Sequence, residues 1–195
     1  MSRTRQVSSN AIASVIAAVA LTILAGCKTQ EKKSEPVSAV AVETQADGIH
    51  LKTGQAEFVL AATGGLVGRF RNGKQWLTLD EVTPGSGVVV TSGKQVVNDF
   101  VREMGHAQIQ PANGKLGALG KRVEVKGHSA STGLDETLTV EVYDNFPNLV
   151  LLSAIYRNTG EKEIALDKVT LQNHSLNASL TDSNAKSHEM WAFFG

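Results

Sequence analysis

Short runs of strand-forming residues, separated by turn signals, are the feature that most constrains how this chain can fold. The runs recur about every 8–12 residues, which is the spacing of strands in β-sandwiches and barrels. Within residues 121–126 and 137–143, apolar and polar side chains alternate, as they do in strands that bury one face. The pattern predicts an all-β fold, an antiparallel β-sandwich, with no amphipathic helix after residue 27.

Two local patterns make this prediction specific. The dipeptide Asn72-Gly73 predicts a β-hairpin, because these residue types adopt the positive φ that tight hairpin turns require. The alternation in 137–143 places Leu138, Val140 and Val142 on the buried face of a strand. The expected strands cover residues 56–61, 65–70, 75–80, 87–91, 95–101, 121–126, 137–143, 148–157 and 164–171.

The N-terminus has the pattern of an export signal. Arg3 and Arg5 precede an apolar run of 14 residues, 11–24, which is shorter than the ~20 residues of a membrane-spanning helix. Leu24-Ala25-Gly26-Cys27 ends this run and resembles the cleavage site of a bacterial lipoprotein. The resemblance implies that Cys27 becomes the first residue of the mature protein and carries the lipid. A plain secretory signal with a chance cysteine, or one short membrane helix, is the alternative.

This interpretation divides the chain into three parts. Residues 1–26 are the signal peptide, 27–47 are the lipidated cysteine and a disordered polar tether, and 48–195 are the sandwich, expected to be truncated at its C-terminal end. The expected location is the bacterial cell envelope, with the bilayer as a partner through Cys27. Lys28 is not the aspartate that resembles an inner-membrane retention signal, which favours the outer membrane.

Composition excludes several classes of protein. The chain carries 19 basic and 19 acidic residues, and Arg3 and Arg5 leave with the signal, so no basic surface for nucleic acid is expected. Cys27 is the only cysteine, which rules out an intrachain disulfide and a cysteine-rich zinc site. No cofactor and no metal are expected.

Several short motifs occur in an order that resembles a known family. The order is similar to that in the N-terminal β-sandwich of melibiase-type α-galactosidases and related glycoside hydrolases. The passages that carry the resemblance are Tyr143–Asn148, Arg157–Gly160, Asp167–Val169, Asn173–Leu176 and Met190–Gly195.

The resemblance has a specific implication for activity. Such enzymes hydrolyse α-galactosides with retention, using two aspartates about 5–5.5 Å apart on a (β/α)₈ barrel of roughly 250 residues that follows the sandwich. No aspartate of this chain matches the catalytic positions, so no catalytic residue is expected, and the sandwich is expected to be inactive without the barrel. An exposed apolar face near Trp191, Phe193 and Phe194 is expected where a barrel domain or partner chain docks.

Two other functions are compatible with the sequence. The chain could be a self-sufficient surface lipoprotein that binds carbohydrate or a partner protein. Trp191 could then stack on a sugar ring, because an aromatic face complements the apolar face of a sugar. A core or inter-domain position is the simpler interpretation of Trp191, and a packed position is the simpler one for Trp76.

A small enzyme of the galactose-mutarotase type is the third hypothesis, since such sandwiches use His and Glu on strands that face one groove. No two candidate histidines have a short paired spacing, so solvated surface positions are the simpler expectation. The candidates are His106, His128, His174, His188, Glu103, Glu124 and Glu189. Calcium ligation by Asp135, Glu136, Asp144 and Asn145 competes with a role of these residues in turns.

Overall fold

The computed structural model describes residues 37–78, 80, 89–92, 95–114, 116–177, 179 and 184. The chain divides into two units, Met1–Ser34 and Glu35–Gly195, and every described residue belongs to the second. The described part is built from antiparallel strands and one 3₁₀ turn, which confirms the predicted all-β fold. Within that part, no helix is long and apolar enough to cross a bilayer.

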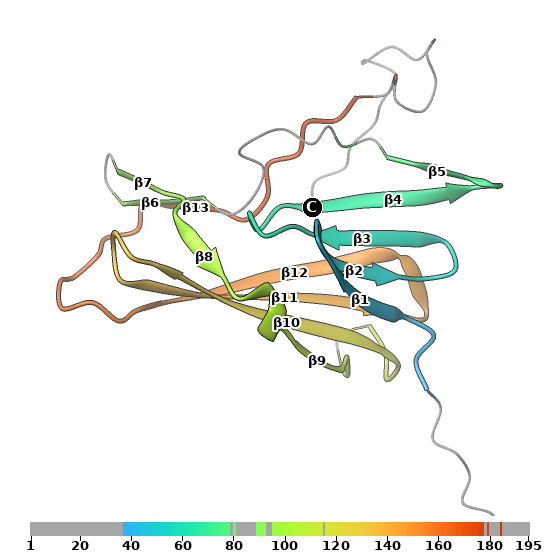
Figure 1. Cartoon of the computed structure of the whole chain (residues 1–195), viewed down its shortest axis with the longest axis horizontal. Coiled ribbons are helices and arrows are strands. Elements are labelled where there is room, and N and C mark those ends of the chain that lie inside the picture. Colours follow the sequence, from blue (N-terminus) through green and yellow to red (C-terminus); the bar gives the residue numbers. More distant parts are fainter. Residues whose placement is uncertain are drawn as a thin grey trace, which may run out of the picture. The chain divides into compact units, whose positions relative to one another are not determined.

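The first sheet is a meander of five strands in chain order (blue to green in Figure 1). Its β4–β5 turn is the predicted hairpin: Asn72 pairs with Gln75, and Gly73 between them has a φ of 61°. The Asn72-Gly73 prediction is therefore confirmed. The strands of this sheet are β1 (Ala41–Gln45), β2 (Gly48–Lys52), β3 (Ala56–Leu60), β4 (Leu66–Asn72) and β5 (Gln75–Leu77).

The second sheet contains the longest strands, in the order β12-β11-β10-β8, and β9 also pairs with β10. Its members are β8 (Phe100–Arg102), β9 (Gln108–Pro111), β10 (Gly120–Ser129), β11 (Leu134–Tyr143) and β12 (Phe146–Asn158), with the 3₁₀ turn η1 (Met104–His106) between β8 and β9. A small third sheet has the order β13-β6-β7 and consists of β13 (Lys168–Thr170), β6 (Val89–Ser92) and β7 (Gln95–Val97).

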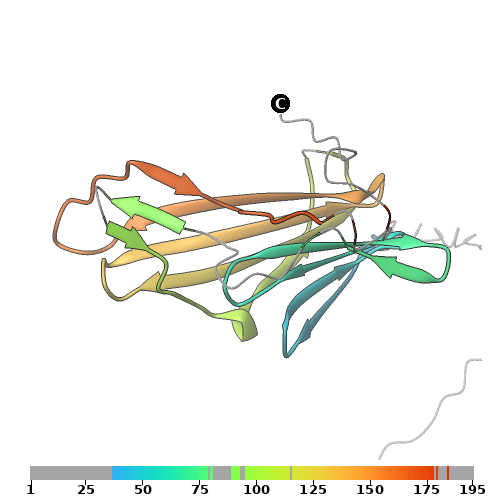
Figure 2. The same cartoon turned by 90° about the horizontal axis from the view of Figure 1, so that it is seen from above.

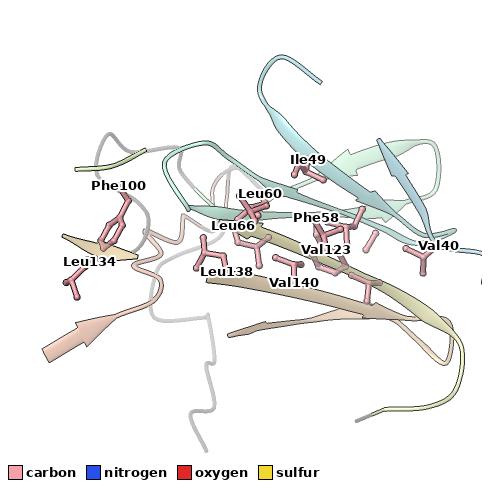
Figure 3. Close-up of a cluster of buried hydrophobic side chains, with 14 of the residues drawn as sticks. Val40, Ile49, Phe58, Leu60, Leu66, Phe100, Val123, Leu134, Leu138 and Val140 are labelled. Carbon is pink, nitrogen blue, oxygen red and sulfur yellow. The ribbon is translucent and has the colours of Figure 1, made fainter. Parts of the chain in front are cut away.

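The core lies between the first two sheets, which face each other as two layers (Figure 2). Figure 3 shows Phe58 and Leu60 of the first sheet lying opposite Leu138 and Val140 of the second. Leu138, Val140 and Val142 are fully buried, as their alternation predicted. Burying each such side chain contributes about 1.5–3 kcal/mol, so the alternation of β11 holds the two layers together.

The folded part begins earlier than the sequence suggested. Residues 41–45, assigned to the tether, form β1 and pair along their whole length with β2. Ser38 Oγ and the Ala39 N–H both donate to the carboxylate of Asp144, at 2.6 and 2.9 Å. A boundary at residue 48 is therefore too late. The strand escaped prediction because β1 is an edge strand whose side chains are almost all exposed, which leaves no apolar alternation to detect.

Other expectations differ in smaller ways. The strand expected over 164–171 is confined to Lys168–Thr170. The strand expected over 148–157 spans 146–158. Trp76, expected to be packed, is exposed because it lies opposite Arg71 on the outer face of the first sheet.

Candidate functional site

The larger of two depressions lies where the first sheet meets the start of β12, and we call it the apolar groove. Its volume is about 610 Å³, which is within the range of small-molecule and docking sites. Its apolar wall comes from β3, β4, β12 and the segment that follows β13. The apolar side chains that define it are Phe58, Leu66, Phe70, Leu149, Val150 and Leu176.

The aromatic wall of the groove depends on a glycine. Phe58 and Phe70 make an edge-to-face contact with ring centroids 6.1 Å apart. Gly68 lies between them on the same face of β4, and a Cβ there would stand 3.3 Å from the Phe70 ring. That distance is tighter than ordinary van der Waals contact, so glycine leaves the ring room to lie across the strand.

A carboxylate–imidazole pair supplies the polar part of the groove. His174 Nδ1 lies 2.8 Å from Asp80 Oδ1, and Asp80 Oδ2 accepts a bond of 3.3 Å from the Gly68 N–H. Asp80 is half-buried, whereas His174 is exposed. An imidazole oriented by a carboxylate can donate, accept or transfer a proton through its other nitrogen.

Gln172 fixes the segment that carries His174 and Leu176. Its side-chain amide accepts from the Leu66 N–H and donates to the Gly64 carbonyl, both at 2.9 Å. Leu176 also forms an isolated antiparallel bridge with Asp80. The segment after β13 is thus held against the β3–β4 turn, which gives the groove a defined wall.

Two passages of the family resemblance meet in this groove. Asn148 ends the passage Tyr143–Asn148, and Leu149 follows it on β12. Asn173, His174 and Leu176 belong to the later passage Asn173–Leu176. These residues line one depression although they stand more than twenty positions apart in the chain. Sequence reasoning missed Asp80, and no local signal marks it, because its partner is 94 residues away.

A second depression, which we call the outer groove, lies on the solvent-facing side of the second sheet. Its volume is about 430 Å³, and its main side chains are Val101, Lys126, His128, Asp135, Ile155 and Arg157. His128 Nδ1 lies 2.7 Å from Asp135 Oδ1. Glu103 also lines this groove.

The structure does not unite the candidate histidines. His128 lies in the outer groove and His174 in the apolar groove, while His106 is exposed on η1. Glu124 pairs with Arg122 at 3.2 Å, not with a histidine. Of the candidate histidines and glutamates that the structure describes, His128 and Glu103 line one groove, as a mutarotase-type enzyme would need.

The candidate calcium ligands are used in other ways. Asp135 and Glu136 are neighbours on β11 and face opposite sides, so Glu136 is buried against Arg102 at 2.7 Å. Asp144 and Asn145 form the β11–β12 turn. Over the described ranges, no group of three His, Cys, Asp or Glu residues is placed to hold a metal ion.

Some predicted residues lie outside the described part of the chain. They are Cys27, His188, Glu189, Trp191, Phe193 and Phe194. Lipidation of Cys27, sugar stacking by Trp191 and docking near Phe193 and Phe194 therefore stay predictions.

Comparison with known proteins adds no relative. No family model matches the chain, and neither the curated proteins nor the solved structures contain a significant match.

Proposed function

We propose that this chain is a lipid-anchored envelope protein whose β-sandwich is the N-terminal, non-catalytic domain of an α-galactosidase-like glycoside hydrolase. The apolar groove is the surface that receives the catalytic barrel. The observation that carries the proposal is the meeting of the two family-like passages, around Asn148 and around His174, at one groove.

The exposed side chains of the groove suit a protein interface. Phe70, Leu149 and Leu176 are 40%, 42% and 48% exposed, although all three are large and apolar. Several such residues gathered at one depression are typical of a docking surface, whereas scattered ones are ordinary. The Asp80–His174 pair at the same place supplies a polar contact that fixes orientation.

The groove is not equipped to hydrolyse a glycoside by itself. Retaining hydrolysis needs two carboxyl groups about 5–5.5 Å apart, one as nucleophile and one as acid/base. Among the described residues that line the groove, Asp80 is the only acid, and its two oxygens are occupied by His174 and the Gly68 N–H. The proposal therefore assigns the chemistry to the barrel and a supporting role to the sandwich.

Capture from the native host tests the docking step. The tagged full chain is purified from membranes, and the bound material is assayed with a chromogenic α-galactoside and identified by mass spectrometry. We expect α-galactosidase activity and a (β/α)₈ hydrolase sequence, either on the same polypeptide or on a bound one. Leu149→Asp combined with Leu176→Asp should remove a separately encoded barrel, because two charges would be buried in the interface.

Ile155→Asp is the matched control, since this residue is exposed on the outer face of the second sheet, away from the apolar groove. Its capture should equal that of the unmodified chain. Where barrel and sandwich share one polypeptide, the double variant should instead lower the thermal stability and activity of that enzyme. Purified material without any α-galactosidase activity would overturn the proposal.

Metabolic labelling with palmitate tests the anchor. We expect the unmodified chain to be labelled. The labelled chain should be found in the detergent-soluble membrane fraction, because a thioether-linked lipid partitions strongly into the bilayer. Cys27→Ser should remove both the label and the membrane association. Label that persists in Cys27→Ser contradicts the lipoprotein assignment.

A further inference from the structure

The outer groove is organised in two rows that cross the second sheet. In the first row, Val101, His128, Asp135 and Arg157 are direct cross-strand neighbours on β8, β10, β11 and β12. Because neighbouring strands stand about 4.8 Å apart, side chains in a row are within reach of one ligand ring or of two adjoining ones.

The second row runs parallel to the first. Lys126, Thr137 and Ile155 are cross-strand neighbours, and the Glu103 N–H donates to the Lys126 carbonyl at 2.9 Å, which places Glu103 beside Lys126. All four of these residues line the same groove.

The charges of the groove are balanced. Lys126 and Arg157 provide cationic donors, while Glu103 and Asp135 provide anionic acceptors. Neither Lys126 nor Arg157 forms an ion pair with another of the residues described, so their N–H groups are available to a ligand. An anionic or cationic ligand would leave one of the two sets unmatched, whereas a neutral polyhydroxy ligand can bond to both.

Apolar contacts complete the surface. Val101 and Ile155 are 75% and 68% exposed. Val101 lies in the first row on β8 and Ile155 in the second row on β12, so they border opposite sides of the groove. The C–H faces of a sugar ring are apolar while its hydroxyls are polar, so a sugar matches this combination of side chains.

The floor beneath the groove is closely packed. Gly127 of β10 lies over the buried Arg102–Glu136 pair, and a Cβ at Gly127 would stand 3.0 Å from Arg102 Cγ. The His128–Asp135 contact of 2.7 Å holds two of the groove side chains in place. The Asp135 side chain is therefore partly ordered before binding, which lowers the conformational entropy that it loses on binding.

We propose that the outer groove binds a neutral oligosaccharide through Lys126, Arg157, Asp135 and Glu103, with Ile155 and Val101 against the sugar rings. The volume of about 430 Å³ lies within the range of small-ligand sites. This site is separate from the apolar groove and rests on its own geometry, so it does not depend on the docking of a barrel.

Affinity electrophoresis of the full chain in non-ionic detergent tests the proposal. The gels contain galactomannan, xyloglucan or dextran as neutral probes and polygalacturonate as an anionic probe. We expect retardation by at least one neutral polysaccharide and none by polygalacturonate. No retardation by any neutral probe, or retardation by polygalacturonate alone, overturns the proposal.

Variants locate the binding. Arg157→Ala and Ile155→Ala should each raise the dissociation constant at least about tenfold, which corresponds to one good polar or apolar contact. Ile109→Ala, an exposed apolar residue of β9 outside the groove, is the matched control and should bind as the unmodified chain does. Thermal melting verifies that each variant is folded. Unchanged retardation of folded Arg157→Ala and Ile155→Ala contradicts the assignment.

Different variants test the docking of a barrel at the apolar groove and the binding of a glycan in the outer groove. Leu149→Asp with Leu176→Asp should leave retardation by the neutral polysaccharide intact, and Ile155→Ala should leave capture of α-galactosidase activity intact. Loss of glycan binding in the Leu149→Asp, Leu176→Asp double variant would show that the sugar binds in the apolar groove. That result would overturn the outer-groove proposal alone.

Discussion

Two charge networks of this sandwich contain similar groups in different surroundings. Inside the sandwich, Arg102 Nε donates to Glu136 Oε2 at 2.7 Å, and the two side chains are 2% and 0% exposed. On the outer face of the first sheet, the ring of His50 lies between Asp47 and Glu57, with both contacts at 2.8 Å. The first network pairs a guanidinium with a carboxylate, whereas the second is centred on a histidine.

The interior network is intolerant of the loss of one member. Tyr156 donates to the second oxygen of Glu136 at 3.0 Å, and burial, together with the Glu136 charge, raises the pKa of Tyr156. Arg102 Nη1 also donates to the Ala62 carbonyl, at 3.2 Å. The two opposite charges thus face each other in the interior, although Arg102 Nη2 has no hydrogen-bond partner among the described residues. Removing one member would leave the other charge uncompensated.

The outer network responds to pH. Burial alone would lower the pKa of His50, but the hydrogen bonds to Asp47 and Glu57 outweigh it, so the pKa of His50 is raised above its ordinary value. Burial would likewise raise the pKa of Glu57, and the bond to His50 with the nearby charges lowers it instead. His50 is itself only 3% exposed, so the two networks differ in the histidine at the centre of the second rather than in depth.

The largest predicted effect comes from breaking the interior pair. Glu136→Ala leaves the Arg102 guanidinium buried without a counter-charge, and we expect the free energy of unfolding to fall by about 3–5 kcal/mol. Urea denaturation followed by circular dichroism measures this. Tyr156→Phe removes only the hydrogen bond to Glu136 and should cost less. A loss below about 1 kcal/mol in Glu136→Ala would show that Arg102 finds another partner.

A glycine substitution beside Arg102 tests the same interior network. Gly64 has a φ of +86°, and a Cβ there would lie 2.8 Å from the guanidinium carbon of Arg102. Gly64→Ala should therefore lower stability by about 1–3 kcal/mol, through backbone strain and displacement of Arg102. Gly54→Ala is the control, since nothing lies within 4 Å of its Cβ position. Equal melting temperatures for the two variants would refute the close approach.

A pH titration tests the outer network. The folded-state pKa of His50 is raised, so its stabilisation is complete below its ordinary value of 6.5 and is lost as pH rises through the folded pKa. The pKa of Asp47 is lowered by its bond to His50, and that of Glu57 is lowered too, so their stabilisation disappears as pH falls below about 4.

We therefore expect this network to contribute most near pH 5–6, and the free energy of unfolding to decline as the pH rises above about 6.5. Denaturant unfolding at a series of pH values measures the decline. His50→Gln should flatten the profile in this interval, because it removes the titrating group. An identical slope in His50→Gln would assign the pH dependence to other groups.

The smallest effect is expected at the rim of the outer network. Arg69 Nη1 lies 3.3 Å from Glu57 Oε2, and the Arg69 side chain is well exposed. Arg69→Ala should change the free energy of unfolding by about 0–1 kcal/mol, because solvent screens exposed pairs. The change should shrink further in 1 M salt. A larger, salt-independent loss would mean that Arg69 acts through packing rather than charge.

The sequence predicted those parts of the fold in which one face of a strand is buried. The alternation of Leu138, Val140 and Val142 reports burial directly, and Asn72-Gly73 reports its turn through local backbone preference. Strand β1 gave no such signal because it is exposed at an edge. The exposure of Trp76 could not be predicted, because a short strand has too few residues for its pattern to show which face is buried.

The grooves were beyond sequence reasoning for a different reason. Asp80 meets His174 across 94 positions of the chain, and Val101 meets Arg157 only through two intervening strands. Such neighbours are set by strand register, and a one-residue slip would send either side chain to the opposite face. His128 and His174 were recognised as candidates by residue type, but which groove each one lines is a property of the folded sheets.

The Ser38 and Ala39 contacts to Asp144 have a mechanical consequence. The N-terminal chain enters the sandwich at this point, and Asp144 stands in the turn that joins the long strands β11 and β12. If the chain is anchored through Cys27 as proposed, tension along the chain would be carried first by these two short bonds to the turn, and only afterwards by the edge pairing of β1. The pull would thereby reach an extensively paired hairpin, and the exposed strand β1 would be protected from unzipping at the edge of its sheet.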